Sequence, residues 1–250
     1  MTGGRLFAAA LAALALVSLP AAEGAAQRRA ARPVARAPAR PAVAQDWTRI
    51  AVRTPEGGVR MGNPAAPVKL IEYGSITCPH CAAFANQGGT EGLHAYVRAG
   101  RVSWEYRPYM IFPTDPGIFA ALGCLAPGQY LGAVEQLYAT QQSWASRVQT
   151  YIEANRSRLQ GMNPPVQQAA LYHAAQLDAL FRAHGLAPAQ ANACIGNPAN
   201  LRRVAETSRQ GAQRYGVQGT PTFFINGTQT APVEYFNQLE PLLIQAGARR

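Results

Sequence analysis

The stretch that decides the fold runs from Val68 to Cys81 and reads Val-Lys-Leu-Ile-Glu-Tyr-Gly-Ser-Ile-Thr-Cys-Pro-His-Cys. Its first six residues are mostly apolar and rich in strand-forming types, and Pro67 and Gly74 bound them. This pattern predicts a central β-strand. The residues after Cys81 continue as a helix, so we expect Cys78 at a helix N-terminus.

The Cys78-Pro79-His80-Cys81 motif carries the chemistry that the sequence predicts. At a helix N-terminus, the Cys78 sulfur meets unpaired backbone N–H groups and the positive end of the helix dipole, which both favour thiolate. Cysteines in such motifs have pKa values of roughly 3.5–7.5, against about 8.5 for a free cysteine. His80 favours the thiolate further when its ring is charged or when a ring N–H points at the sulfur. A stabilised thiolate favours the reduced form, so the disulfide becomes a stronger oxidant.

Two structural alternatives exist for this cysteine pair. Half of a zinc site is disfavoured, because Cys124 and Cys194 are 70 residues apart and do not form a second compact pair. A purely structural disulfide is disfavoured because so small a ring constrains little of the chain. We therefore interpret Cys78 as the attacking thiol and Cys81 as the resolving thiol.

The sequence on either side of the motif predicts a mixed α/β architecture. Residues 102–106 alternate apolar and polar side chains and complete a strand–helix–strand unit. Helical periodicity dominates residues 114–211. The strand pattern then returns at 222–225, with a hairpin signal at Asn226-Gly227, and a last helical segment covers 232–246. We expect an α/β domain, built from 46–113 and 212–250, with an all-helical domain inserted at 114–211.

The N-terminal region is expected to direct export. One arginine, an apolar run and small residues make 1–26 a predicted signal peptide, and the alternative is an uncleaved membrane anchor. Residues 27–45 are rich in Ala, Pro and Arg and are predicted to form a linker. Half of the formal net charge of +10 lies in residues 1–45, and the basic tail 27–45 contains no aromatic residue, so nucleic-acid binding is disfavoured.

Several motifs together resemble the DsbA family of the thioredoxin superfamily, and more narrowly its alphaproteobacterial branch. They are Met61-Gly62-Asn63-Pro64, the run Glu72-Tyr73-Gly74-Ser75, the Cys-Pro-His-Cys motif and Gly216-Val217-Gln218-Gly219-Thr220-Pro221-Thr222-Phe223. The resemblance covers about residues 46–250 and implies a thioredoxin-like fold with an inserted helical domain.

The resemblance also implies roles for individual residues. Cys78 corresponds to the exposed nucleophile and Cys81 to its buried partner. Pro221 corresponds to a cis-proline, and the backbone of Thr220 would bind an extended substrate. Glu72 corresponds to a buried acid that handles the Cys81 proton, and its alternative is a carboxylate paired with Lys69 or with an arginine.

The second cysteine pair is expected to form a disulfide, Cys124–Cys194, as in the alphaproteobacterial branch. An even number of cysteines in an exported chain favours disulfides as well. The alternative is a pair of separate buried thiols.

The expected function is disulfide donation to reduced or unfolded exported proteins in the periplasm. We expect a monomer that a DsbB-like membrane oxidant re-oxidises, with no cofactor or metal besides its own cysteines. One alternative is an isomerase or reductase that a membrane partner keeps reduced. The other is a soft-metal-binding or chaperone-like module that uses Cys78, His80 and Cys81.

Overall fold

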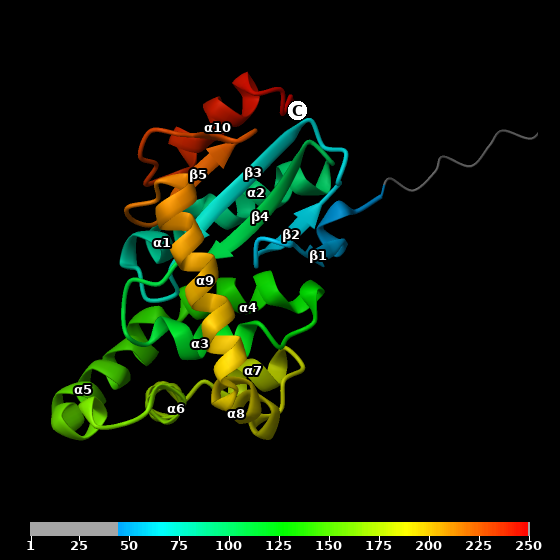
Figure 1. Cartoon of the computed structure of the whole chain (residues 1–250). Coiled ribbons are helices and arrows are strands. Elements are labelled where there is room, and N and C mark those ends of the chain that lie inside the picture. The colour runs from blue at the N-terminus through cyan, green and yellow to red at the C-terminus, as the bar shows by residue number, and fades with distance from the viewer. Residues whose placement is uncertain (1–44, 250) are drawn as a thin grey trace, which may run out of the picture. The chain divides into compact units, whose positions relative to one another are not determined.

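The computed structural model describes residues 45–249. The predicted signal peptide, and all but the last residue of the predicted linker, lie outside the described residues and stay predictions. Figure 1 shows a mixed sheet with helices packed around it and a group of helices, α5 to α8, at the end away from α10.

The six strands of the sheet have the order β1-β2-β4-β3-β5-β6. Their bounds are β1 (Ala51–Arg53), β2 (Val59–Gly62), β3 (Val68–Gly74), β4 (Val102–Pro108), β5 (Thr222–Ile225) and β6 (Thr228–Gln229). Strand β3 pairs parallel with β4 and antiparallel with β5, so it lies inside the sheet. The central strand predicted from its apolar composition is thus confirmed.

A broken helix connects the two parallel strands. It comprises α1 (Pro79–Phe84), the π-helical segment η2 (Ala85–Gly89) and α2 (Thr90–Arg98). Gly88 adopts a φ of +92° inside η2, a conformation that glycine reaches at no steric cost. The predicted strand–helix–strand unit is therefore present, and its helix is interrupted in η2, where Gly88 lies.

The chain between β4 and β5 is helical, as its periodicity predicted. Its helices are α3 (Asp115–Leu122), α4 (Pro127–Ala139), α5 (Gln141–Gln160), α6 (Pro164–Ala175), α7 (Asp178–Ala183), α8 (Pro188–Gly196) and α9 (Pro198–Tyr215). The exact domain boundaries at 113/114 and 211/212 stay predictions.

Helix α9 links the helical block to the sheet, which it crosses in Figure 1. Near its C-terminus, a Cβ added at Gly211 would lie 2.8 Å from the ring of Tyr73 on β3. Tyr215 and Phe224 pack around the same tyrosine. This close approach requires a glycine and fixes α9 against one face of the sheet.

The C-terminal segment forms the predicted hairpin and helix. Strands β5 and β6 pair antiparallel around Asn226 and Gly227, both with positive φ. Helix α10 (Phe236–Gln245) follows and buries Leu239 and Leu243. A short 3-10 helix, η1 (Trp47–Arg49), precedes β1.

Candidate active site

The two cysteines of the motif are placed by the end of β3 and the start of α1. Cys78 is the N-cap residue of α1, and Pro79 occupies the first turn, where a missing N–H costs nothing. Both cysteines are free thiols, so the described site is the reduced form. Cys78 is 4% exposed and Cys81 is fully buried, which makes Cys78 the more accessible of the two sulfurs.

The surroundings of Cys78 favour its thiolate. The Cys81 thiol, the Thr220 hydroxyl and the backbone N–H groups of Cys81 and His80 together lower the pKa of Cys78 to about 5, against the opposing effect of burial. The N–H contributions are those expected where a helix begins. A pKa near 5 leaves Cys78 almost fully ionised at neutral pH.

Cys81 is held in the opposite charge state. Burial and the neighbouring Cys78 sulfur raise the pKa of the Cys81 thiol well above its usual range. One sulfur is therefore a thiolate while the other keeps its proton. This asymmetry gives the two cysteines different chemical roles.

The loop before β5 completes the wall opposite Cys78. The Thr220–Pro221 peptide bond is cis, and the Cys78 sulfur lies 3.2 Å from the Thr220 carbonyl oxygen, to which it donates a hydrogen bond in its protonated form. The Thr220 hydroxyl is buried beside both sulfurs and has no hydrogen-bond partner of ordinary geometry among the described residues. The cis bond that the resemblance implied is present, 142 residues from Cys78 along the chain.

Glu72 lies in the sheet below Cys81. It is 2% exposed, and Oε2 accepts a hydrogen bond from the indole N–H of Trp104 at 3.0 Å. Burial raises the pKa of Glu72 to about 8, and the charge of Glu135 adds to the rise, while the Trp104 hydrogen bond opposes it. Glu72 is therefore a protonated acid at neutral pH.

The alternative prediction, in which Glu72 pairs with Lys69, is wrong. The Lys69 ammonium donates to the carbonyl oxygens of Pro64 and Ala66, both at 2.6 Å. Residues three apart on a strand point to opposite faces of the sheet, so Lys69 and Glu72 cannot meet. The hydrogen bond that Glu72 does accept comes from Trp104, in the neighbouring strand.

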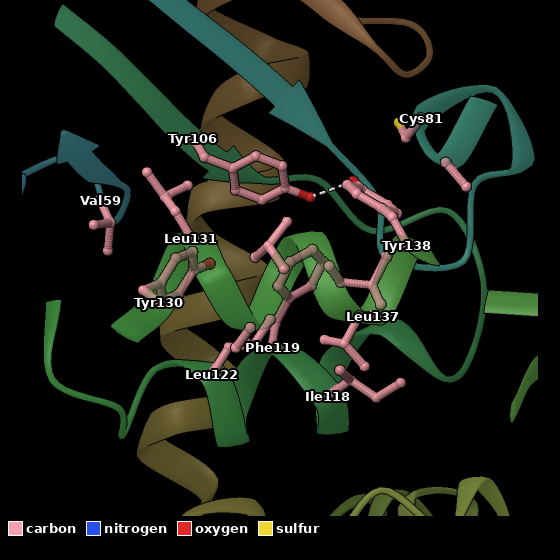
Figure 2. Packing of buried hydrophobic residues seen from close by; sticks show 14 of the residues in the cluster. Val59, Cys81, Tyr106, Ile118, Phe119, Leu122, Tyr130, Leu131, Leu137 and Tyr138 are labelled. Carbon is pink, nitrogen blue, oxygen red and sulfur yellow. Dashed lines mark hydrogen bonds between the residues drawn. The ribbon is translucent and has the colours of Figure 1, made fainter. Parts of the chain in front are cut away.

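Figure 2 shows two tyrosines, Tyr106 and Tyr138, whose hydroxyls meet in the core near Cys81. The hydroxyls of Tyr106 and Tyr138 share a hydrogen bond of 2.7 Å, and Tyr138 also donates to the Ser75 carbonyl at 3.2 Å. Burial and the neighbouring charges raise the pKa of both tyrosines well above the usual range, so they stay protonated. They supply hydrogen bonds under the site without adding charge.

Two residues that the sequence did not single out hold the loop before Cys78. The buried Asp115 carboxylate accepts hydrogen bonds from the Ser75 hydroxyl and from the Thr77 hydroxyl and N–H, and from two backbone N–H groups of its own loop. Gln141 donates from Nε2 to the carbonyls of Ile76 and Cys78, at 2.8 and 2.9 Å. The only local signal was Asp115 before a proline at a helix start.

His80 contributes less directly than the sequence suggested. Its backbone N–H faces Cys78, while its side chain is exposed at the surface beside the exposed Pro79. A role for the His80 imidazole stays a prediction.

The second cysteine pair forms the expected disulfide. Cys124 and Cys194 are joined, with their Cα atoms 6.5 Å apart. Cys124 lies in the turn just after α3 and Cys194 lies in α8, so the bond ties that turn to a helix that is distant in sequence.

Comparison with known proteins identifies the family. A family model described as thioredoxin matches residues 54–243. The chain belongs to the thioredoxin family. Two curated relatives, from Rickettsia conorii and Rickettsia prowazekii, are named as protein-disulfide oxidoreductases, and each is 22% identical over 73% of this chain. The chain spans only 58% and 59% of those relatives' own lengths.

Solved structures that resemble this chain have the same fold. A protein-disulfide isomerase from Novosphingobium aromaticivorans is 25% identical, with a TM-score of 0.69 over 75% of this chain and 96% of that one. The α-DsbA1 of Wolbachia pipientis is 17% identical, with a TM-score of 0.59 over 78% of this chain and 93% of that one. The expected DsbA-like fold, with its helical insertion, is confirmed.

Among residues 45–249, no group of three or more His, Cys, Asp or Glu side chains could hold a metal ion. None of the helices in this range combines the length and apolar character needed to cross a membrane.

Proposed function

We propose that the protein is a thiol–disulfide oxidoreductase that donates the Cys78–Cys81 disulfide to reduced, unfolded exported proteins. The observation that carries this proposal is the asymmetry of the cysteine pair, with an ionised Cys78 facing Thr220 and a protonated Cys81 buried behind it. A thiolate that is stable in the reduced form makes its disulfide a strong oxidant. The proposal therefore includes a direction of electron flow, from substrate to enzyme.

The reaction has two exchange steps. A substrate thiolate attacks the Cys78 sulfur, the bond between Cys78 and Cys81 breaks, and Cys81 leaves as a thiolate that takes the proton of Glu72. A second substrate thiolate then attacks the substrate sulfur of the mixed disulfide, and Cys78 leaves as a thiolate. The substrate loses two electrons and gains a disulfide, and the enzyme gains both electrons as two reduced cysteines.

The surface around Cys78 suits an unfolded polypeptide. Ile111 and Phe112 expose 43% and 47% of their surface, and a cleft of about 560 Å³ extends from Phe112 and Thr77 along α5. A second cleft of about 410 Å³ borders Thr220 and Pro221. Unfolded chains present apolar side chains and free backbone groups, which these two surfaces can bind.

We place this activity in the periplasm, with a DsbB-like membrane oxidant returning the cysteines to the disulfide. Two features support this location: the leader-like sequence of residues 1–26, and the Cys124–Cys194 disulfide, a bond that is typical of exported proteins. We also propose that the protein acts as a monomer.

A disulfide isomerase is the second candidate, since the Novosphingobium neighbour bears that name. The reduction potential separates the two functions, measured by equilibrating the full chain with glutathione buffers. A donor should lie nearer to about −120 mV, the value of a strong oxidant, than to about −270 mV, the value of thioredoxin. A potential at or below that of thioredoxin would overturn the proposed direction.

A further inference from the structure

Outside the cysteine motif, a histidine–glutamate pair lies beside Trp104, the hydrogen-bond donor to Glu72. His94 on α2 and Glu135 on α4 approach to 2.9 Å between Nε2 and Oε1. Their side chains are about a quarter exposed, at 25% and 26%, yet the two contacting atoms are shielded from solvent. The pair thus joins two helices, with its contact facing inward and its outer part in water.

The pair is connected to Glu72 through Trp104. The His94 ring lies 6.0 Å from the Trp104 ring, measured between centroids. The indole N–H of the same tryptophan donates to Glu72 Oε2 at 3.0 Å. Glu135 also acts on Glu72 by charge, because its carboxylate disfavours a second negative charge nearby and raises the pKa of Glu72.

Other titratable groups face the same region. Cys81 on α1, Tyr106 on β4 and Tyr138 on α4 lie around Glu72. The charge of Glu135 acts on His184 as well. Among these groups, Glu135 is the one whose charge raises the pKa of Glu72 in the reduced protein.

We propose that Glu135, held by its contact with His94, is a positioning residue that controls when Glu72 gives its proton to Cys81. The inference rests on the proposed function. When the disulfide opens, the proton moves from the Glu72 carboxyl to the Cys81 thiolate, leaving a carboxylate and a thiol. Glu135 exchanges no atom or electron in this step. Its negative charge keeps the proton on Glu72 until the disulfide opens and Cys81 becomes a thiolate.

The test compares two variants that act on the charge in the same direction. Glu135→Gln removes the negative charge, and His94→Lys places a permanent positive charge beside it. The control is Glu153→Gln, an equal change of charge at an exposed position of α5. The titration of Glu72 is followed by the infrared band of its protonated carboxyl, assigned by its loss in Glu72→Gln.

We expect the Glu72 titration midpoint to fall by about one pH unit in Glu135→Gln and to fall also in His94→Lys. The pH profile for reduction of the Cys78–Cys81 disulfide by dithiothreitol should shift by the same amount, and Glu153→Gln should match the wild type. Unchanged midpoints in the variants that fold would overturn the inference. Failure of the proposed function would instead appear as a wild type no more active in substrate oxidation than Cys78→Ser.

Discussion

The ionisation of Cys78 makes the stability of the reduced protein depend on pH. The substitution Cys78→Ser should remove this dependence. Its surroundings lower the pKa from an ordinary value of about 9 to about 5 in the folded protein. A group with a lowered folded pKa contributes stability that is fully present above the unfolded value and is lost as the pH falls through the folded value. Cys78→Ser cannot ionise and lacks this contribution at every pH.

The size of the effect follows from the two pKa values. Between pH 5 and pH 7, each pH unit adds about 1.4 kcal/mol, so the thiolate stabilises the reduced protein by about 2.7 kcal/mol at neutral pH. The oxidised protein has no thiol to ionise and gains nothing. The same energy makes the disulfide more oxidising by about 60 mV than a pair with an ordinary thiol pKa.

The assay is urea denaturation of the reduced wild type and of reduced Cys78→Ser at intervals from pH 4 to pH 8. The difference in free energy of unfolding should grow by about 2.7 kcal/mol between pH 4 and pH 7. Glu72 titrates in both proteins, so its contribution largely cancels in the difference. Parallel stability curves, or a Cys78 alkylation rate that rises only near pH 9, would refute the reasoning.

Three further changes have defined outcomes. In Glu72→Gln, the stability of the reduced protein should lose the pH dependence that the raised pKa of Glu72 imposes. As the pH rises from 4.5 to 7, the free energy of unfolding of the wild type should fall by about 3 kcal/mol relative to the variant. Urea denaturation that gives the same pH dependence for both proteins would contradict this. In Asp115→Asn, the new side-chain NH2 group would face hydroxyl and backbone N–H donors that now bind the carboxylate, and we expect the free energy of unfolding to fall by about 3 kcal/mol by the same method. A fall below about 1 kcal/mol would show that the hydrogen bonds to Asp115 do not hold the loop. Joint replacement of Cys124 and Cys194 by serine should cost about 2–4 kcal/mol in non-reducing buffer with an unchanged Cys78 alkylation rate, and a changed rate would reveal a link between the two pairs.

The sequence predicted the elements that depend on local pattern. Strand β3 follows from a short run of strand-forming residues between Pro67 and Gly74. The cysteine motif could be placed at a helix start for the same reason. The cis bond before Pro221 and the Cys124–Cys194 disulfide needed the resemblance, because neither can be derived from local pattern.

The contacts that complete the site could not be predicted, since they join distant parts of the chain. Asp115 lies 40 residues from the Ser75 hydroxyl that it binds, and Gln141 lies 63 residues from the Cys78 carbonyl. Helical periodicity indicates that α4 and α5 have buried faces but does not say which polar side chain meets the active-site loop. The Glu135–His94 pair was missed for the same reason.

The central claim is that Cys78 carries disulfides to substrate proteins, and oxidative refolding tests it most directly. A reduced, unfolded protein whose activity requires disulfides is mixed with the oxidised wild type, with Cys78→Ser, or with the double serine variant of Cys124 and Cys194. We predict fast recovery of substrate activity with the wild type and the double variant, and only the uncatalysed rate with Cys78→Ser. Equal rates for the wild type and Cys78→Ser would contradict the account.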